Sequence, residues 1–185
     1  MILCITGMPN SGKSTAASIL SKKGFKIVEM RSFIEKEMKK EHIKVDPLSI
    51  RDFSTKIRER MGQDAVAQLA IKHIKAMKGN IIISGIRSVY EINYFKSKIK
   101  NDFYVIAITA PARIRYKRAI AVEKPDATKT YSEFIKRDKI EKSWGLADAI
   151  DNADFIISNT STQKALESSL SKVLDIINST HANAK

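Results

Sequence analysis

Five short apolar runs along the chain predict the strands of one sheet. Three of them, ILCIT (2–6), IIIS (81–84) and FYVIAIT (103–109), are continuous, which is typical of parallel strands covered on both faces. FKIVEM (25–30) and ADFIIS (153–158) predict two further strands. Helical patterns fill the intervals between these runs. The alternation predicts an α/β domain with a mostly parallel five-stranded sheet.

The helical stretches carry start and stop signals. The helices over 14–23, 46–62 and 64–79 are each predicted to end at or beside a glycine. Several begin at a residue whose side chain can accept a backbone N–H bond. The predicted N-caps are Asp46, Asp64, Ser88, Thr130 and Thr160, and the last three have Glu or Gln three positions on.

These elements are predicted to form a single domain over residues 1–178. A helical lobe occupies about 30–78, between the second and third strands. A basic helix, a polar loop and a second helix that begins at Thr130, within about 113–142, form a candidate lid. Residues 179–185 are predicted to be a flexible tail because they follow the last apolar position of the final helix.

Composition narrows the class of partner. The 185 residues carry a net charge of +13, which favours anionic partners, although a lysine-rich solvated surface explains part of this excess equally well. No apolar run approaches the roughly 18 residues of a membrane span, and the first apolar run has no basic segment before it. We therefore expect a cytoplasmic protein. One cysteine and three scattered histidines favour neither a zinc cluster nor disulfides.

The segment GMPNSGKST (7–15), called the phosphate loop below, lies between the first predicted strand and helix. It matches the pattern G-x-x-x-x-G-K-[ST], in which glycines let successive backbone N–H groups approach phosphate oxygens at a helix start. Lys13 is expected to reach the β and γ phosphates of ATP, and Ser14 to place its hydroxyl on Mg²⁺. Residues expected to contact the nucleotide here are Gly7, Met8, Pro9, Asn10, Ser11, Gly12, Lys13, Ser14 and Thr15.

Later segments add a family resemblance. ITGMPNSGKST, IRERMGQDAVA, IIISGIRSVYEI, PARIRYKR and ADFIISN together resemble the archaeal dephospho-coenzyme A kinase-like family, an adenylate-kinase-related group of P-loop proteins, over about residues 1–175. The resemblance implies a three-layer P-loop NTPase fold of the nucleoside monophosphate kinase type. It also implies ATP with Mg²⁺ as cofactors and an acceptor site between the sheet and the helical lobe.

The same resemblance assigns acceptor-binding positions to Gly85 and Arg87, after the third strand. Related kinases carry an acidic residue just before this glycine, where the chain has Ser84. At the exit of the second strand, Ser32 stands where an Asp is expected and Glu35 where an arginine is expected. The sequence leaves open whether catalysis survives these changes.

Two nearby residues are candidate replacements for these missing groups. Glu29 is the candidate carboxylate, and Arg31 is the candidate acceptor-binding guanidinium. Arg58, in the lobe, matches a further position that is implied to contact the acceptor phosphate. A surface role for Arg58 fits the sequence equally well.

The resemblance also assigns roles to residues of the lid. Arg115 and Arg118, one turn apart, are implied to cover the adenine and clamp the triphosphate, and Arg137 to reach the transferring phosphoryl group. A solvated basic helix is the alternative. Asn159 follows the fifth strand, where related folds bind adenine. Trp144 is either a lid hinge or a core anchor beside the last strand.

Two functions fit these observations. The first is an ATP-dependent phosphotransferase that moves the γ phosphate of Mg-ATP to a small nucleotide-like acceptor. The second is a nucleotide-dependent switch or slow ATPase associated with RNA or a protein partner, which the serines and the charge favour, although no RNA-recognition motif is present. The residues expected to act in catalysis are Lys13, Arg87, Arg115, Arg118 and Arg137. The acceptor and the oligomeric state are not predicted.

Overall fold

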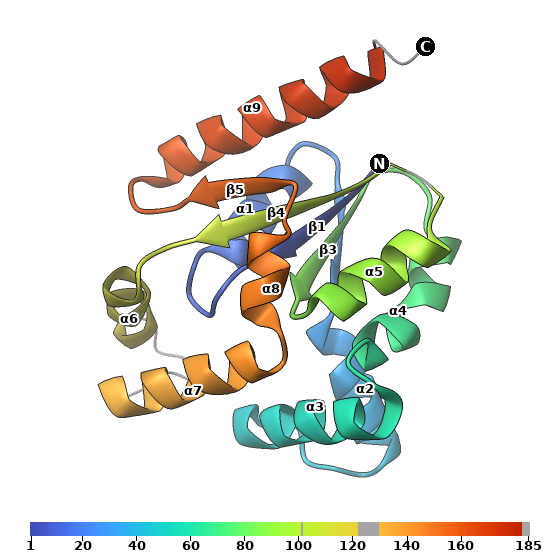
Figure 1. Cartoon of the computed structure of the whole chain (residues 1–185), viewed down its shortest axis with the longest axis vertical. Coiled ribbons are helices and arrows are strands. Elements are labelled where there is room, and N and C mark those ends of the chain that lie inside the picture. Colours follow the sequence, from blue (N-terminus) through green and yellow to red (C-terminus); the bar gives the residue numbers. More distant parts are fainter. Residues whose placement is uncertain (101, 122–129, 183–185) are drawn as a thin grey trace.

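A five-stranded parallel sheet forms the centre of the molecule (Figure 1). The computed structural model describes residues 1–100, 102–121 and 130–182, with side chains through residue 180. The strands are β1 (Ile2–Thr6), β2 (Lys26–Glu29), β3 (Ile81–Ile86), β4 (Phe103–Thr109) and β5 (Phe155–Ser158). Their order is β2-β3-β1-β4-β5, and all four neighbouring pairs are parallel. The predicted α/β class is confirmed.

Helices connect the strands. They are α1 (Lys13–Ser21), α2 (Arg31–Lys40), α3 (Pro47–Met61), α4 (Ala65–Ala76), α5 (Val89–Lys98), α6 (Ala112–Ile120), α7 (Tyr131–Ser143), α8 (Leu146–Asp151) and α9 (Gln163–Ala182). The sequence analysis missed α8, because six residues are too few for a helical period to show. It also placed residues 179–182 in a flexible tail. The structure continues α9 through Ala182, so these residues extend the last helix, and their flexibility stays a prediction.

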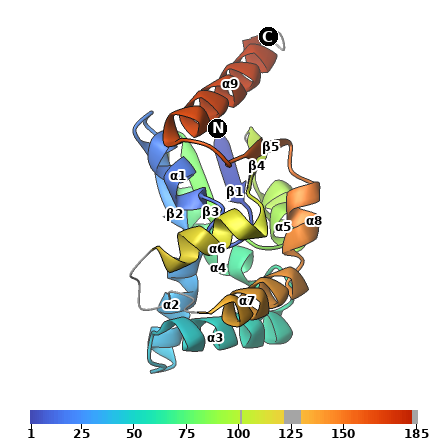
Figure 2. The ribbon, with the colours of Figure 1, turned by 90° about the vertical axis from the view of Figure 1, so that its left-hand side faces the viewer.

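Alternate residues of the three central strands, β1, β3 and β4, belong to two hydrophobic clusters, one on each face of the sheet. Leu3 and Ile5 of β1 pack with apolar residues of α1 and α9. Ile2 and Cys4 pack with those of α4, α5 and α8 on the opposite face. Because both faces are covered, the strands read as the continuous apolar runs that predicted them. The result is a three-layer arrangement (Figures 1 and 2).

The helical lobe consists of α2, α3 and α4, which lie between β2 and β3 along the chain and extend beyond one end of the sheet (Figure 2). Its interior is continuous with the cluster under the sheet. The lobe residues in that cluster include Phe33, Met38, Phe53, Ile57 and Ile74. The lobe is therefore fixed to the sheet by shared packing.

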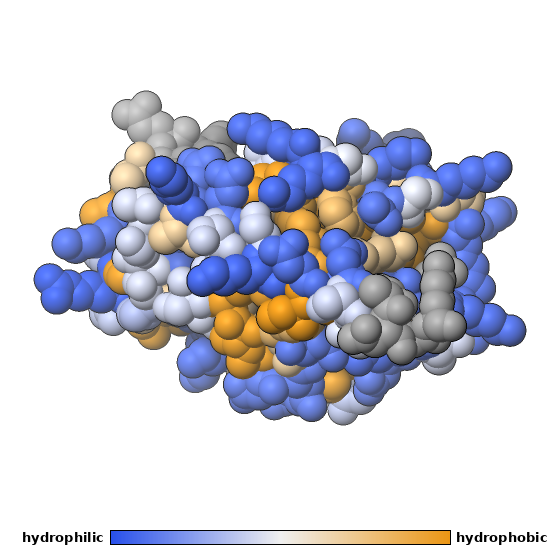
Figure 3. All heavy atoms as spheres, turned by 90° about the horizontal axis from the view of Figure 1, so that it is seen from above, coloured by the Kyte–Doolittle hydropathy of each residue, from blue (hydrophilic) through white to orange (hydrophobic). Residues whose placement is uncertain are grey.

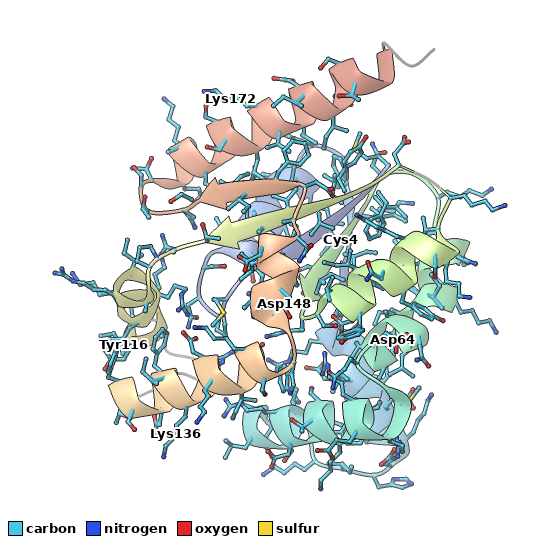
Figure 4. The ribbon with its side chains drawn as sticks, in the orientation of Figure 1. Cys4, Asp64, Tyr116, Lys136, Asp148 and Lys172 are labelled. Atoms are coloured by element: carbon cyan, nitrogen blue, oxygen red, sulfur yellow. The ribbon has the colours of Figure 1, made fainter. Side chains whose placement is uncertain are left out.

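Two helices of the candidate lid, α6 and α7, pack through aromatic rings. Tyr116 of α6 contacts Tyr131 and Phe134 of α7, with ring centroids 5.1 and 5.5 Å apart (Figure 4). The polar loop between these helices was predicted from KPDATK, and its residues 124–129 lie outside the described part of the chain. The described lid is thus a helix pair held by an aromatic contact.

Most predicted helix starts are confirmed. The Asp46 carboxylate accepts N–H bonds at the start of α3. Thr130 and Glu133 form a complete capping box. The final helix is an exception, because Thr162 and not Thr160 caps α9, with its Oγ1 accepting the Ala165 N–H at 3.2 Å.

Two other caps differ from the prediction. Asp64 precedes α4 but makes no side-chain cap bond, and its Oδ1 instead accepts from Gln68. Ser88 caps α5 by accepting the Glu91 N–H, but the Glu91 carboxylate does not return to Ser88. It accepts the N–H of Arg87 instead, at 2.7 Å. Glu91 is thereby directed into the interior beside the β3 exit.

The outer surface is rich in charged side chains. Lys136 of α7 and Lys172 of α9 lie on outward faces of their helices (Figure 4). In the view from above, polar and charged residues surround a smaller apolar area (Figure 3). Within the described ranges, no helix combines the length and apolar character that crossing a membrane requires.

Candidate active site

The phosphate loop occupies the turn between β1 and α1, at the centre of the sheet. Gly7 and Gly12 have positive φ angles of 140° and 108°. A Cβ atom on Gly7 would lie 2.2 Å from the Ile108 carbonyl oxygen, and one on Gly12 would lie 2.1 Å from Asn159 Nδ2. Both positions therefore require glycine for their backbone angle and for space.

The loop delivers backbone donors to the start of α1. Asn10 and Gly12 both adopt left-handed conformations, and Gly12 is the N-cap of α1 without a side-chain cap bond. The first N–H groups of a helix have no acceptor within that helix, and they carry partial positive charge. The Ser11 N–H, by contrast, turns back to the Met8 carbonyl at 3.1 Å. Donors at the start of α1 are thus left for an anion.

The Lys13 ammonium lies across this loop. Its Nζ donates to the carbonyl oxygens of Gly7 at 2.7 Å and Met8 at 3.0 Å, and so it is bonded to neutral groups. Burial lowers the pKa of Lys13 well below its usual value, and the positive charges of Arg87 and Arg137 lower it further. An anion placed here would relieve that unfavourable charge environment.

Arg118 and Asn159 support the loop from outside. The Ser11 carbonyl accepts from Asn159 Nδ2 at 2.8 Å and from Arg118 Nη1 at 3.1 Å. Arg118 Nη2 also donates to the Asn159 carbonyl at 2.8 Å, and the Asn159 N–H donates to Thr109 at 2.7 Å. In this structure both residues position the loop backbone. Their direct contact with adenine or phosphate stays a prediction.

Arg115 is engaged in a buried ion pair. Its guanidinium donates to both carboxylate oxygens of Asp138, at 2.8 and 2.6 Å, and to the Pro9 carbonyl at 3.2 Å. Only 5% of Arg115 is exposed, so the alternative of a solvated basic residue is wrong for it. The pair fastens α6 to α7 and to the phosphate loop. A triphosphate clamp by Arg115 would require this pair to open, and that role stays a prediction.

A pocket of about 310 Å³ opens beside the loop, at the carboxyl ends of β1, β2 and β3. The lobe and α7 form its other walls. Its cationic side chains are Lys13, Arg31, Arg51, Arg58, Arg87 and Arg137. Its carboxylates are Glu29, Glu91 and Glu141. Every arginine that the sequence analysis assigned to the acceptor therefore reaches one pocket, together with Lys13.

Arg58 is buried at the lobe end of this pocket. Its Nη2 bonds to Glu91 Oε1 at 2.9 Å and its Nη1 to the Ser54 carbonyl at 2.9 Å. Only 4% of the residue is exposed, so the surface alternative for Arg58 is wrong. Burial raises the pKa of Glu91, and the charge of Arg58 opposes that rise. Sequence reasoning missed Glu91 as a site residue, although a glutamate among the apolar positions of α5 is a usable signal.

Arg87 leaves the end of β3 and points across to α7. Its guanidinium forms an ion pair with Glu141, which is buried. Burial and the neighbouring charges of Arg58 and Arg137 lower the pKa of Arg87 to about 10. Glu141 is a second carboxylate that sequence reasoning missed. This pair connects the lid helix α7 to the β3 exit.

Trp144, at the end of α7, lies beside both Arg58 and Arg87. Its ring lies 4.8 Å from the Arg58 guanidinium and 5.9 Å from that of Arg87. Its Nε1 donates to Thr55 Oγ1 of α3 at 3.2 Å. The expected place beside the last strand is therefore wrong. Trp144 joins α7 to the lobe and lines the pocket.

Glu29 supplies a carboxylate on the strand next to Ser84, which stands where an acidic residue was expected. It ends β2 and is opposite Ser84 of β3 in the sheet register. Ser32 Oγ donates to the Glu29 carbonyl at 2.8 Å. Arg31, which also lines the pocket, forms an ion pair with Glu35 at 2.7 Å. The local arrangement thus puts Glu29 in the pocket by way of the neighbouring strand.

The donor set fits Mg²⁺. Among the described residues no group of three or more His, Cys, Asp or Glu side chains could hold a metal. Mg²⁺ does not need such a group, since it binds through one or two protein ligands, substrate phosphates and water. The hydroxyl of Ser14 and the carboxylate of Glu29 line the same pocket as Lys13. These two residues would hold the ion.

The parallel sheet, its strand order and a glycine-rich loop after the central strand define a P-loop protein with a kinase-like fold. Residues 3–155 match the family described as "AAA domain". UPF0200 protein PH1008 of Pyrococcus horikoshii is 34% identical over 182 residues, covering 94% of this chain and 98% of the relative. The chain belongs to the AAA domain family and to the UPF0200 proteins.

Other comparisons agree. UPF0200 protein SSO1041 of Saccharolobus solfataricus is 33% identical over 176 residues, covering 94% of this chain and 92% of that protein. TT1252 from Thermus thermophilus superimposes with a TM-score of 0.64 at 19% identity, covering 95% of this chain and 96% of that one. Shikimate kinase from Acinetobacter baumannii, in complex with shikimate, has a TM-score of 0.61 at 15% identity, covering 97% and 93%.

At these low identities the structural likeness shows the fold alone. The predicted P-loop, kinase-like fold is confirmed by it. The finer resemblance to dephospho-coenzyme A kinases stays a prediction.

Proposed function

We propose that this protein is a phosphotransferase that moves the γ phosphate of Mg-ATP to a small anionic acceptor. The observation that carries this proposal is the position of Lys13, which lies at the phosphate loop and at the head of a pocket lined by five arginines. A binding site for nucleotide phosphates is thereby continuous with a site for a second anion. The sequence analysis expected a small nucleotide-like acceptor. The pocket supports two parts of that expectation, the small size and the negative charge of the acceptor.

The phosphate loop would bind the β and γ phosphates. Backbone N–H groups at the start of α1 and the Lys13 ammonium supply the positive charge. Lys13 would exchange two neutral carbonyls for charged oxygens, which form stronger hydrogen bonds with an ammonium. Mg²⁺, held by Ser14 and Glu29, would neutralise further phosphate charge.

Transfer requires the acceptor oxygen to approach the γ phosphorus in line with the leaving oxygen. The bond from this phosphorus to the β–γ bridging oxygen breaks as the new oxygen–phosphorus bond forms, and ADP leaves with the electron pair. The proton of a hydroxyl acceptor passes to water, because this reaction makes little demand on a strong base. Arg87 and Arg137 line the pocket where charge develops on the equatorial oxygens.

Arg115 and Arg118 would contribute by positioning the phosphate loop. They hold the Pro9 and Ser11 carbonyls of the loop, so that the opposite N–H edges are left for phosphate. The Arg115–Asp138 pair would keep α7, with Glu141 and Trp144, against the pocket. Closing this side of the site excludes water, which favours transfer over hydrolysis.

A nucleotide-dependent switch or slow ATPase is the second candidate. The buried Ser84 favours it, since no carboxylate stands at the end of β3 where related kinases have one. Glu29 on the adjacent strand favours the phosphotransferase instead. RNA or a protein would be the partner of such a switch.

The two candidates predict different products from γ-labelled ATP. The protein would be incubated with Mg-ATP and, separately, with nucleoside monophosphates, dephospho-coenzyme A, small hydroxy acids, phosphate esters and RNA. Label transferred to one small acceptor, and lost in Arg87→Gln, is the expected result. Release of free phosphate that only RNA accelerates would contradict the phosphotransferase and support the switch.

A further inference from the structure

The lobe end of the pocket has a chemistry that selects among acceptors. We propose that this acceptor subsite, formed by Arg58, Arg87, Trp144 and the apolar wall of the lobe, takes a compact acceptor with one anionic group on an aliphatic body. A nucleoside monophosphate is not the acceptor in this proposal. The inference rests on the proposed function, because it names the substrate class of the same site.

Charge is the first argument. Six cationic side chains line the pocket against three carboxylates, so the lining carries an excess of positive charge even though Arg31 pairs with Glu35, a residue outside the lining. The Arg58–Glu91 and Arg87–Glu141 pairs use the two carboxylates at the lobe end. The terminal phosphates of ATP take up charge at the Lys13 end. At the lobe end Arg51 of α3 adds a positive charge to these two ion pairs, and a second anionic group balances that excess.

A buried donor without a partner is the second, independent argument. Arg58 Nε has no hydrogen-bond partner among the described residues, although the side chain is 96% buried and lines the pocket. An unsatisfied buried donor is costly, and such groups are rare in native proteins unless a ligand or water pairs with them. Arg58 is locked at its other two nitrogens by Glu91 and Ser54. The Nε–H thus remains a buried donor, in a residue that lines the lobe end of the pocket, to which the described residues offer no acceptor.

The residues that line the walls of the pocket indicate the chemistry of the rest of the acceptor. Beside its arginines, the lobe contributes four apolar residues to the lining, Ile34 from α2, Pro47 and Ile50 from α3 and Val66 from α4. Trp144 is the one aromatic residue among the described lining residues, and two guanidinium groups already lie over its ring. A nucleobase would therefore find no ring to stack on.

Groups that could read the edge of a base are also scarce. Asn10 is the single side-chain amide among the described lining residues, and it belongs to the phosphate loop. The lobe contributes only Ser54 as a neutral polar side chain. A base in this position would face guanidinium and carboxylate groups that already bond to each other, so its hydrogen bonds to water would be replaced only in part, which costs binding free energy. An aliphatic body has no such cost.

Size supports the same conclusion. The pocket of about 310 Å³ includes space beside Lys13 and Ser14, where the transferring phosphoryl group belongs. Ligand pockets usually measure about 300 to 1,000 Å³, so this one is at the small end even before ATP is bound. The acceptor thus has few atoms beyond its anionic group and its nucleophilic oxygen.

Trp144 is the single tryptophan of the chain, and its fluorescence reports directly on this subsite. The full chain would be titrated with glycerol 3-phosphate, inorganic phosphate, AMP and adenosine, with and without Mg-ADP. We expect a saturable change in emission with glycerol 3-phosphate and phosphate, and at least about tenfold weaker binding of AMP. AMP binding as tightly as glycerol 3-phosphate, or no response to either phosphate ester or phosphate, would overturn the proposal.

Variants separate the subsite from general charge. Arg58→Gln is expected to weaken glycerol 3-phosphate binding at least about tenfold, since a hydrogen-bonded charge is lost. Arg60→Gln, which removes an exposed arginine paired with Glu41, is the matched control and should leave binding unchanged. If circular dichroism shows that Arg58→Gln does not fold, Arg87→Gln replaces it. Equal effects of the subsite and control variants would overturn the proposal.

Failure of this proposal is distinguishable from failure of the proposed function. Mg-ATP binding is measured on the same samples by calorimetry, where Arg58→Gln should retain the wild-type affinity within about threefold. Intact Mg-ATP binding with tight AMP binding would overturn the compact acceptor alone. A lack of Mg-ATP binding would instead contradict the proposed phosphotransferase function.

Discussion

Glu29 and Ser84 are opposite each other in the parallel pairing of β2 with β3, and both line the pocket that contains Lys13. The carboxylate expected at the end of β3 is thus found one strand away. Parallel strands bring their carboxyl ends to one edge, so the exchange keeps an acidic group in the same pocket. This relationship makes a kinase compatible with the serine at position 84.

Glu29→Gln should impair the dependence on Mg²⁺. Loss of the carboxylate is expected to raise the Mg²⁺ concentration needed for half-maximal transfer about tenfold or more, because even residues that only hydrogen-bond to metal ligands typically matter at that scale. ATP binding without Mg²⁺ should be unchanged. Glu59→Gln, on the exposed side of α3, is the control. Unaltered Mg²⁺ dependence in Glu29→Gln would contradict this role.

Gly7→Ala should disrupt the phosphate loop. The new Cβ atom would lie 2.2 Å from the Ile108 backbone oxygen, which cannot move without shifting β4. Gly79→Ala is the matched control, since Gly79 also has a positive φ, of 90°, but no atom within 4 Å of the added carbon. We expect Gly79→Ala to lower the free energy of unfolding by about 1 kcal/mol and to retain ATP binding. Gly7→Ala should lose ATP binding, as measured by calorimetry alongside denaturant unfolding.

Arg118 and Asn159 should act as one unit. Both donate to the Ser11 carbonyl, and Arg118 also bonds to the Asn159 carbonyl. Arg118→Gln and Asn159→Ala are each expected to weaken ATP binding about tenfold. The double variant should lose less than the product of the two effects, because the second change acts on a loop that is already displaced. Strictly multiplicative losses would show that the two residues act independently.

ATP binding should take up a proton at alkaline pH. Burial and Arg87 lower the pKa of Lys13 in the free protein below its ordinary value of 10.5, while bound phosphate favours the charged form. Between the lowered pKa and that of the complex, Lys13 is neutral when free and charged when bound. The affinity for ATP therefore falls as the pH rises through the lowered pKa.

Calorimetry in two buffers with different ionisation enthalpies measures this uptake. Lys13→Arg is the control, because a guanidinium stays protonated across this range and binding should then take up no proton from that position. Equal proton uptake in the wild type and in Lys13→Arg would contradict the assignment.

Features set by local sequence were predicted well. The strand over 103–109 has the predicted bounds, and the loop glycines at positions 7 and 12 adopt the angles that their role requires. Apolar runs and glycines act within a few residues, so the sequence shows them directly. The short helix α8 was missed because six residues do not show a helical period. The cap of α9 was misplaced because the neighbouring Thr and Ser residues give nearly the same signal.

The ion pairs and hydrogen bonds inside the site depend on how elements that are distant in the sequence pack together. Arg58 and Glu91 are 33 positions apart, and Trp144 and Thr55 are 89 apart. Nothing in the sequence near Arg115 indicates that the Asp138 carboxylate will accept hydrogen bonds from both terminal nitrogens of its guanidinium. The resemblance identified which arginines gather at the site. The carboxylates that hold them became visible only in the structure.

Binding of Mg-ATP to the wild type and to Lys13→Ala, measured by titration calorimetry, tests the central claim most directly. We predict micromolar to submillimolar binding by the wild type and a loss of about 100-fold or more in Lys13→Ala, with both proteins folded by circular dichroism. Equal affinity in the two proteins would contradict the account.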